Sequence, residues 1–190
     1  MATATPVTAA PKRVLYIVGL RNYDALYSGT RHNVGASALI HLAKLYSAVW
    51  TSKGDSDVAL LKDSVQLVLP RTFMNLSGRP VAKLFPKKEY ANHDLIVAHD
   101  ELELKLGQVK VKAGGSARGH NGVKSIIDCL GGLNSFPRVL IGIDRPASRD
   151  ARAVSEHVLG KFTKSESEAL ELAFHNTCVA IEDLIQKRAV

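Results

Sequence analysis

One stretch decides the fold: Val14-Leu15-Tyr16-Ile17-Val18, which runs directly into Gly19-Leu20-Arg21-Asn22. The apolar part is rich in β-branched and aromatic side chains, which is typical of a buried strand. Apolar residues then recur at steps of three and four, at Ala38, Leu42, Leu45 and Val49, and this spacing predicts a helix. Asn22 and His32 therefore lie between the carboxyl end of a strand and the start of a helix, where open α/β sheets bind their ligands.

The same kind of junction recurs along the chain. Two short apolar runs at 57–62 and 65–69 predict a hairpin or two consecutive strands, and the second run leads into a turn with Asn75 before a helical pattern. The apolar run 94–98 ends at His99-Asp100, and the run 108–112 precedes a glycine-rich loop and His120-Asn121 at another helix start. Alternating strands and helices predict an α/β fold, a single domain with a mixed, mainly parallel sheet flanked by helices. We expect its polar turns to converge at one edge of the sheet, and their members are Asn22, His32, Asn75, Asp100, His120 and Asn121.

The two ends of the chain read differently. Residues 1–11 are rich in Ala and Thr, and we expect a disordered N-terminal extension before a domain at 12–190. Near the other end, the pattern predicts a surface loop at 147–153 and a short helix at 154–159. A capping box at Ser165-Glu166-Ser167-Glu168 would then start a terminal helix.

The position of His32 has a consequence for its protonation. Ser28 or Thr30 could cap the helix that follows it. The positive end of a helix dipole disfavours an imidazolium, so the ring would stay neutral and could accept a proton. The alternative is a histidine that only satisfies backbone groups at the helix start.

Charge and composition limit the partners. The formal net charge is +7, and the segment between Leu104 and Ile127 holds basic residues and no acidic one. This favours a polyanionic partner. The 2 cysteines, Cys129 and Cys178, are too isolated for a disulfide framework or a thiolate metal site. No apolar run approaches the roughly 20 residues that span a bilayer, so no membrane partner is expected.

The junction residues favour one reaction type. A serine nucleophile elbow and the common zinc-ligand spacings are absent from the sequence. With His32 as general base and Asp100 as its hydrogen-bond partner, water could attack an acyl group directly, and an asparagine amide would stabilise the oxyanion. This suits an activated acyl group such as an ester, with no metal and no cofactor.

Three other interpretations stay open. The chain could be an RNA-binding domain without catalysis, which its basic surface would also suit. It could be a metal-dependent hydrolase that uses His32, Asp100 and His120 as ligands. The polar turns could also serve only as caps, although this leaves the basic segment unexplained.

Five ordered motifs resemble bacterial-type peptidyl-tRNA hydrolases, over about residues 13 to 185. They are Val18-Gly19-Leu20 with Asn22 and Tyr27, Thr30-Arg31-His32-Asn33-Val34-Gly35, Thr72-Phe73-Met74-Asn75-Leu76-Ser77-Gly78, His99-Asp100-Glu101-Leu102, and Gly119-His120-Asn121-Gly122. The resemblance implies hydrolysis of the ester between a peptide and the 3′ ribose of tRNA. The N-terminal extension suggests a eukaryotic member of the family. We expect a monomer in the cytoplasm, with mitochondria as the alternative.

The resemblance also implies roles for individual residues. His32 would be the base that activates water, and Asp100 its partner. Substrate would be held by Asn22, Asn75 and Asn121, and the cleft would be lined by Tyr27, Met74 and His120. The tRNA acceptor stem and its 5′ phosphate would meet the basic residues Lys105, Lys110, Lys112 and Arg118.

The chain departs from the family's pattern at four places. Tyr23-Asp24 stands where Pro-Gly is usual, so the loop that holds Asn22 is expected to differ in shape. Leu140 replaces an arginine, which removes one expected phosphate contact. Asp144 and Arg118 stand where glycine is usual. These changes leave activity expected and put the affinity for tRNA in doubt.

Overall fold

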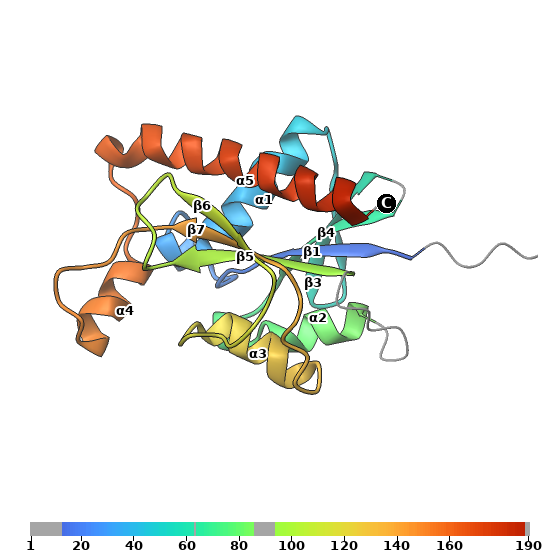
Figure 1. Cartoon of the computed structure of the whole chain (residues 1–190), viewed down its shortest axis with the longest axis horizontal. Coiled ribbons are helices and arrows are strands. Elements are labelled where there is room, and N and C mark those ends of the chain that lie inside the picture. The colour runs from blue at the N-terminus through green and yellow to red at the C-terminus, as the bar shows by residue number, and fades with distance from the viewer. Residues whose placement is uncertain (1–12, 63, 86–93, 189–190) are drawn as a thin grey trace, which may run out of the picture.

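A computed structural model describes residues 13–62, 64–85 and 94–188. Within them, one 7-stranded sheet has the order β2-β3-β4-β1-β5-β7-β6 (Figure 1). The strands are β1 (Leu15–Gly19), β2 (Trp50–Lys53), β3 (Ser56–Lys62), β4 (Val65–Pro70), β5 (Leu95–Glu101), β6 (Val109–Lys112) and β7 (Arg138–Gly142). The helices are α1 (Val34–Leu45), α2 (Gly78–Leu84), α3 (Asn121–Cys129), α4 (Ala151–Leu159) and α5 (Ser167–Arg188). Short 3₁₀ turns are η1 (Ala25–Tyr27), η2 (Arg31–Asn33), η3 (Met74–Leu76) and η4 (Lys164–Glu166).

The centre of the sheet is parallel and its edges are antiparallel. β1 pairs in parallel with β4 on one side and with β5 on the other, and β5 pairs in parallel with β7. The hairpin β3–β4 and the pairs β2–β3 and β6–β7 are antiparallel. The predicted fold class, a single α/β domain with a mixed, mainly parallel sheet, is confirmed, and so is the predicted hairpin.

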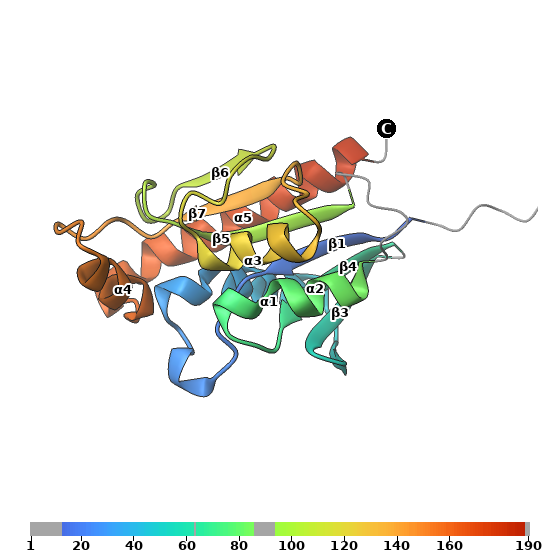
Figure 2. The same ribbon diagram turned by 90° about the horizontal axis from the view of Figure 1, so that it is seen from below.

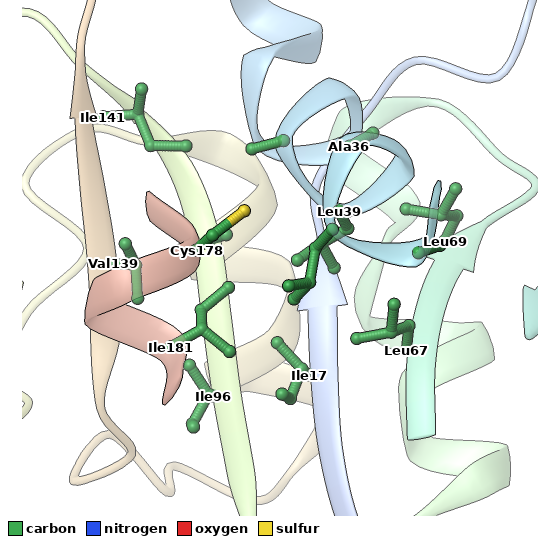
Figure 3. Packing of buried hydrophobic residues seen from close by; sticks show 14 of the residues in the cluster. Ile17, Ala36, Leu39, Leu67, Leu69, Ile96, Val139, Ile141, Cys178 and Ile181 are labelled. Atoms are coloured by element: carbon green, nitrogen blue, oxygen red, sulfur yellow. The ribbon is translucent and has the colours of Figure 1, made fainter. Parts of the chain in front are cut away.

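Helices cover both faces of the sheet. α1 and α5 lie on one face, and α2 and α3 lie on the other (Figures 1 and 2). Under α1 and α5, Leu39 and Ile181 pack with the strand residues Ile17, Ile96 and Val139 in one apolar core (Figure 3). α4 lies apart from both layers, at the end of the sheet toward which β5 points (Figure 1), and it has no buried residue. That end is where the carboxyl ends of the parallel strands meet.

Two glycines let separate elements approach each other closely at this end. A Cβ on Gly35, in the first turn of α1, would lie 2.2 Å from the carbonyl oxygen of Ala98 in β5. A Cβ on Gly122, at the start of α3, would lie 2.5 Å from the sulfur of Met74. Only glycine avoids such overlaps. The starts of α1 and α3 are therefore drawn onto β5 and η3.

Four local expectations were wrong. β5 extends past the predicted Ala98 through Glu101, because β7 pairs with it as far as Glu101↔Gly142, and Asp100 lies at the end of the strand as expected. α4 already begins at Ala151, capped by Asp150, so only the first part of the predicted loop 147–153 is a loop. α1 ends at Leu45 and leaves Val49 outside. Ser28 and Thr30 make no side-chain cap of α1, whose N-cap position is Asn33.

The capping box near the C-terminus is formed by other residues than expected. The pair is Thr163, the N-cap of η4, and Glu166, the last residue of η4 before α5 begins. Glu166 also receives two hydrogen bonds from Arg31, at 2.7 and 2.9 Å, which ties this turn to η2. The expected extension at 1–11 lies outside the described residues. Among the described residues, no helix combines the length and apolar character that crossing a bilayer requires.

Candidate active site

A cleft of about 700 Å³ opens at the carboxyl end of the parallel strands. Its walls come from the turns after β1 and β4, the end of β5, the start of α3, and α4. The candidate site residues that line it are Asn22, Tyr27, His32, Met74, Asn75, Asp100, Arg118, His120 and Asn121. The predicted convergence of the polar turns is confirmed.

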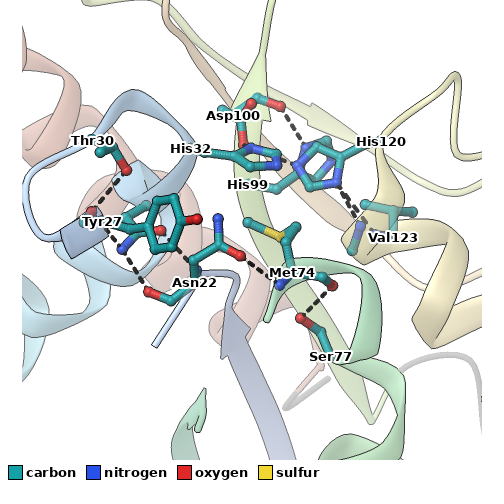
Figure 4. Close-up of polar contacts among 12 residues, drawn as sticks. Asn22, Tyr27, Thr30, His32, Met74, Ser77, His99, Asp100, His120 and Val123 are labelled. Atoms are coloured by element: carbon teal, nitrogen blue, oxygen red, sulfur yellow. Dashed lines mark hydrogen bonds and ion pairs between the residues drawn. The ribbon is translucent and has the colours of Figure 1, made fainter. Parts of the chain in front are cut away.

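Asp100 is the centre of the site and is only 5 % exposed. Its Oδ1 atom lies 2.8 Å from Nδ1 of His32 and 2.9 Å from Nε2 of His120 (Figure 4). Both imidazoles therefore share one carboxylate oxygen, and their ring centres are 5.0 Å apart. An ionised carboxylate only accepts hydrogen bonds, so each of these two nitrogens carries a hydrogen.

The other nitrogens of the two rings have different surroundings. Nδ1 of His120 faces the backbone N–H groups of Gly122 and Val123, at 3.2 and 3.4 Å, and caps α3. It accepts hydrogen bonds there and so carries no hydrogen. Within the described part of the chain, Nε2 of His32 has no hydrogen-bond partner. It is the unprotonated nitrogen of a ring that lines the cleft, and it is free to take a proton from water.

The charge of Asp100 decides the protonation of His32. Burial of the ring lowers its pKa, but the charge of Asp100 and the hydrogen bond to it outweigh burial and leave the pKa of His32 above 6.5. The direction of this shift is opposite to the one expected from a helix dipole, because the charge of Asp100 dominates. His120, and not His32, occupies the N-cap position of a helix. Burial would raise the pKa of Asp100, but the two histidines hold it well below its usual range.

A third histidine supports the pair from behind. His99 is 3 % exposed, and its ring centre lies 4.5 Å from that of His120 in an edge-on arrangement. Its Nδ1 donates to the backbone oxygen of Asp100 at 2.7 Å. Burial, followed by the nearby His120, lowers the pKa of His99 to about 3. The ring is therefore neutral and has a positional role.

Hydrogen bonds fix both the side chain and the backbone of Asn22. Its Oδ1 accepts a hydrogen bond from the backbone N–H of Met74 at 2.8 Å. Asn33 bonds to the backbone of Asn22 in both directions, at 2.8 Å from the N–H and 3.0 Å to the oxygen. With Oδ1 occupied, the amide nitrogen of Asn22 points toward the gap between Tyr27 and His32 (Figure 4). It is a fixed donor on the cleft wall.

Asn75 and Asn121 also line the cleft, with exposed side chains. Asn75 lies in η3, next to the buried Met74, and Asn121 opens α3, next to His120. Each directly follows a residue, Met74 or His120, that hydrogen bonds to other parts of the site hold in place. Their freedom from internal hydrogen bonds in the described structure leaves them available for a ligand.

Several cleft residues carried no predicted role. Phe73 packs edge-on against Tyr27, with ring centres 6.5 Å apart. α4 supplies a wall of Val154, Ser155, Val158 and Leu159, and Arg145 lies beside it, paired with Glu103 at 2.5 Å. The pattern of α4 could not indicate this wall, because the helix buries no apolar face. Arg31 and Asn33 belong to a motif, and their partners lie outside it: Arg31 binds Glu166, and Asn33 binds the turn of Asn22.

The basic residues divide into two groups. Arg118 lines the cleft, whereas Lys105, Lys110 and Lys112 lie outside it. Lys110 and Lys112 belong to the edge strand β6 and pair in register with Leu140 and Arg138. None of the four expected tRNA contacts, Lys105, Lys110, Lys112 and Arg118, has an ion pair with another described residue. Their positive charges are therefore not paired by any described acidic side chain.

Two of the departures from the family's pattern have a backbone explanation. Arg118 has φ of 48° and Asp144 has φ of 58°. Glycine adopts this left-handed conformation at little cost, and other residues do so under strain. Both positions therefore keep the backbone shape that glycine would give, with a side chain added.

The donor set His32, Asp100 and His120 could in principle hold a metal ion, since one ligand atom from each lies within 4.8 Å of the others. The hydrogen bonds of His120 argue against it. If Nε2 bound a metal, the ring hydrogen would have to move to Nδ1, where it would face the N–H groups of Gly122 and Val123. Three N–H groups would then face one another with no acceptor among them. The residues fit a hydrogen-bonded carboxylate better than a metal site.

Comparisons with known proteins agree with this geometry. A family model described as peptidyl-tRNA hydrolase matches residues 16–190. The peptidyl-tRNA hydrolase of Hahella chejuensis is 38% identical over 179 residues, which cover 92% of this chain and 91% of that protein. That of Lactiplantibacillus plantarum is 43% identical over 170 residues, 87% and 90% of the two chains. The crystal structure of peptidyl-tRNA hydrolase from Acinetobacter baumannii superposes with a TM-score of 0.83 at 31% identity, over 96% and 93% of the chains. These relatives are bacterial and lend no support to the expected eukaryotic origin.

Proposed function

Because this chain belongs to the peptidyl-tRNA hydrolase family, and so hydrolyses the ester bond of peptidyl-tRNA, we propose that His32 is the general base of that reaction. The observation that carries the proposal is the pair of hydrogen bonds on Oδ1 of Asp100. It leaves His32 as the histidine whose second nitrogen is free at the cleft. Asp100 orients the ring and stabilises the imidazolium that forms.

The reaction follows from these positions. Nε2 of His32 takes a proton from water while the water oxygen attacks the ester carbonyl carbon. Negative charge develops on the carbonyl oxygen, where the fixed amide N–H of Asn22 can stabilise it. The tetrahedral intermediate then collapses, the bond to the 3′ oxygen of the ribose breaks, and His32 returns its proton to that oxygen. The products are the free peptide and tRNA with a 3′ hydroxyl.

The remaining cleft residues hold the substrate. Asn75 and Asn121 have free amide groups that suit the peptide backbone and the attacking water. Tyr27 and Met74 provide apolar surface beside the reacting bond, and His120 keeps Asp100 in place. An ester needs no strong acid for its leaving alcohol, so a single histidine is sufficient for both proton transfers.

The tRNA part of the substrate would meet the basic side of the cleft. Lys110, Lys112 and Lys105 present unpaired charge outside the cleft, and Arg118 presents it at the rim. Contacts to phosphates give affinity without reading sequence, as an enzyme for many tRNAs requires. The acceptor stem and the 3′ end are the proposed contact region. A monomer acting in the cytoplasm completes the proposal, with mitochondria as the alternative compartment.

The test is release of the peptide from an N-blocked aminoacyl-tRNA by wild type, His32→Ala and a matched control, His175→Ala on the exposed part of α5. We expect the first variant to lose about 10²- to 10⁴-fold in kcat, the range for a general base, and the control to match wild type. Dialysis against a transition-metal chelator, with magnesium kept for the tRNA, should change nothing. A His32→Ala enzyme within about threefold of wild type would remove His32 from the role of base, and loss of turnover on chelation would favour the metal-dependent alternative.

A further inference from the structure

Tyr23 follows Asn22 directly, and two guanidinium groups lie near its ring. The Cζ atoms of Arg21 and Arg71 are 4.9 and 5.0 Å from its ring centre. Cations at this distance from an aromatic ring are attracted by its electron-rich system. The phenol is 44 % exposed, and its hydroxyl makes no hydrogen bond to any described residue. The ring itself is thus the part of Tyr23 that the protein uses.

The carboxylate of Asp57 interacts with both guanidinium groups. Nη2 of Arg21 donates to Oδ2 of Asp57 in β3 at 2.6 Å, and Oδ1 of Asp57 lies 3.9 Å from Nε of Arg71. Nε of Arg21 also donates to the backbone oxygen of Pro70 at 2.9 Å. Without Asp57 and the ring, two neighbouring positive charges would repel each other. The arrangement is therefore a built stack that joins the turn after β1 to the end of β4.

The stack flanks a ladder of bonds between the same two turns. The N–H of Tyr23 donates to the oxygen of Thr72 at 3.0 Å, and the N–H of Met74 donates to Oδ1 of Asn22 at 2.8 Å. The parallel pairing of β1 and β4 is thereby continued beyond the strands into the cleft wall. A shift of either turn would move the amide nitrogen of Asn22 relative to His32.

We propose that Tyr23, clasped by Arg21 and Arg71, is a positioning residue that fixes the Asn22 amide in the cleft. The inference rests on the proposed role of Asn22 at the ester carbonyl. Tyr23 touches no reacting atom, and it acts by holding the turn after β1 against the turn after β4. Since the hydroxyl is unused, phenylalanine should serve as well as tyrosine, whereas an aliphatic residue should not.

The test compares Tyr23→Phe, Tyr23→Leu and a matched control, Tyr46→Leu. Tyr46 also has a cation on its ring, Lys62 at 5.3 Å, but it lies at the end of α1 outside the cleft. We expect Tyr23→Phe to equal wild type and Tyr23→Leu to lose about 5- to 30-fold in kcat, the factor that two such contacts represent. Tyr46→Leu should keep kcat even if it melts earlier. Equal kcat for Tyr23→Leu and wild type would overturn the proposal.

A double-mutant cycle tests whether the effect passes through Asn22. In an Asn22→Ala background, Tyr23→Leu should cost nothing further. The same loss in both backgrounds would show that Tyr23 does not act through this amide, and the proposal would be wrong.

Hydrogen exchange supplies a readout that needs no activity. Met74 N–H should exchange faster in Tyr23→Leu, and also in Arg71→Met, which keeps the bulk of the side chain and removes one cation. Unchanged protection of the Met74 N–H in both variants would show that Tyr23 and Arg71 do not hold this turn. A wild-type protein that hydrolyses no peptidyl-tRNA would defeat the proposed function instead, while the exchange of Met74 would still decide the role of Tyr23.

Discussion

Replacing Asp100 with asparagine (Asp100→Asn) separates the charge of this residue from its shape. The carbonyl oxygen of the amide can accept both hydrogen bonds that Oδ1 now accepts, at 2.8 Å from His32 and 2.9 Å from His120. Both neighbours are donors, so the amide has reason to turn its oxygen toward them. The tautomer of His32 is then kept, and only the negative charge is lost.

The size of the effect follows from the distance. An imidazolium and a carboxylate with charge centres about 4 Å apart attract by ~4 kcal/mol at an effective dielectric constant of 20. A neutral carbonyl dipole retains part of this, so we expect a loss of about 2–3 kcal/mol for the cation that forms during proton transfer. This corresponds to roughly 30- to 200-fold in kcat.

The pH dependence gives the sharper assay. The base is active when neutral, so kcat falls as pH drops through the pKa of His32, which Asp100 holds above 6.5. In Asp100→Asn, burial still lowers the pKa of His32 and the opposing negative charge is gone. The pH at which kcat falls should therefore move below 6.5, and the maximal kcat at high pH should also be lower. Asp128→Asn, an exposed carboxylate paired with Lys124, is the control and should change neither. If the fall in Asp100→Asn stayed where it is in wild type, Asp100 would not set the protonation of His32.

Three further predictions concern other parts of the molecule. The pKa of His99 is lowered to about 3, so below pH 6.5 its ring binds a proton in the unfolded chain and not in the native state. The free energy of unfolding should therefore fall by roughly 1.4 kcal/mol per pH unit between pH 6.5 and 4. Urea titrations of His99→Phe should lack that slope. Below about pH 5 the carboxyl of Asp100 in the unfolded chain also begins to bind a proton, so the slope that belongs to His99 is measured above about pH 5. Lys112→Ala should weaken tRNA binding and lower the slope of log affinity against log salt by about 1, at unchanged kcat; an unchanged slope would place Lys112 away from phosphate. Asp144→Gly should remove the strain of the left-handed backbone at this position and raise the free energy of unfolding by about 1 kcal/mol. A melting temperature that does not increase would contradict this prediction.

Hydrophobic periodicity was sufficient to predict the sheet and its junctions, because the central strands are buried on both faces and read as apolar runs. It failed where an element buries nothing. β2 is exposed over most of its length and went unpredicted, and α4, which has no buried residue, was predicted only from Val154 onward. Their positions depend on neighbours in space, and a local pattern does not record them.

Long-range bonds limited the prediction of the site in the same way. The sign of the pKa shift of His32 depends on a residue 68 positions away, and the real capping box near α5 includes a glutamate that also binds Arg31, 135 positions away. Local rules placed His32 at a helix start, whereas the structure gives the N-cap position of α3 to His120. Similarly, Asn33 stands next to the proposed base, yet its role is visible only through its bonds to the turn of Asn22.

Three imidazoles meet at this site, and the backbone around them leaves one able to act as base. His99 donates through Nδ1 to a carbonyl and is buried, and His120 must accept through Nδ1 because two N–H groups point at it. His32 alone donates inward through Nδ1 and turns a free nitrogen to the cleft. Nε2 of His99 also lacks a partner among the described residues, but it is buried. The start of α3 therefore excludes His120 as the base, burial excludes His99, and His32 is left. Any substitution that lets His120 release the start of α3 should therefore disturb the shared oxygen of Asp100, and with it the protonation of His32.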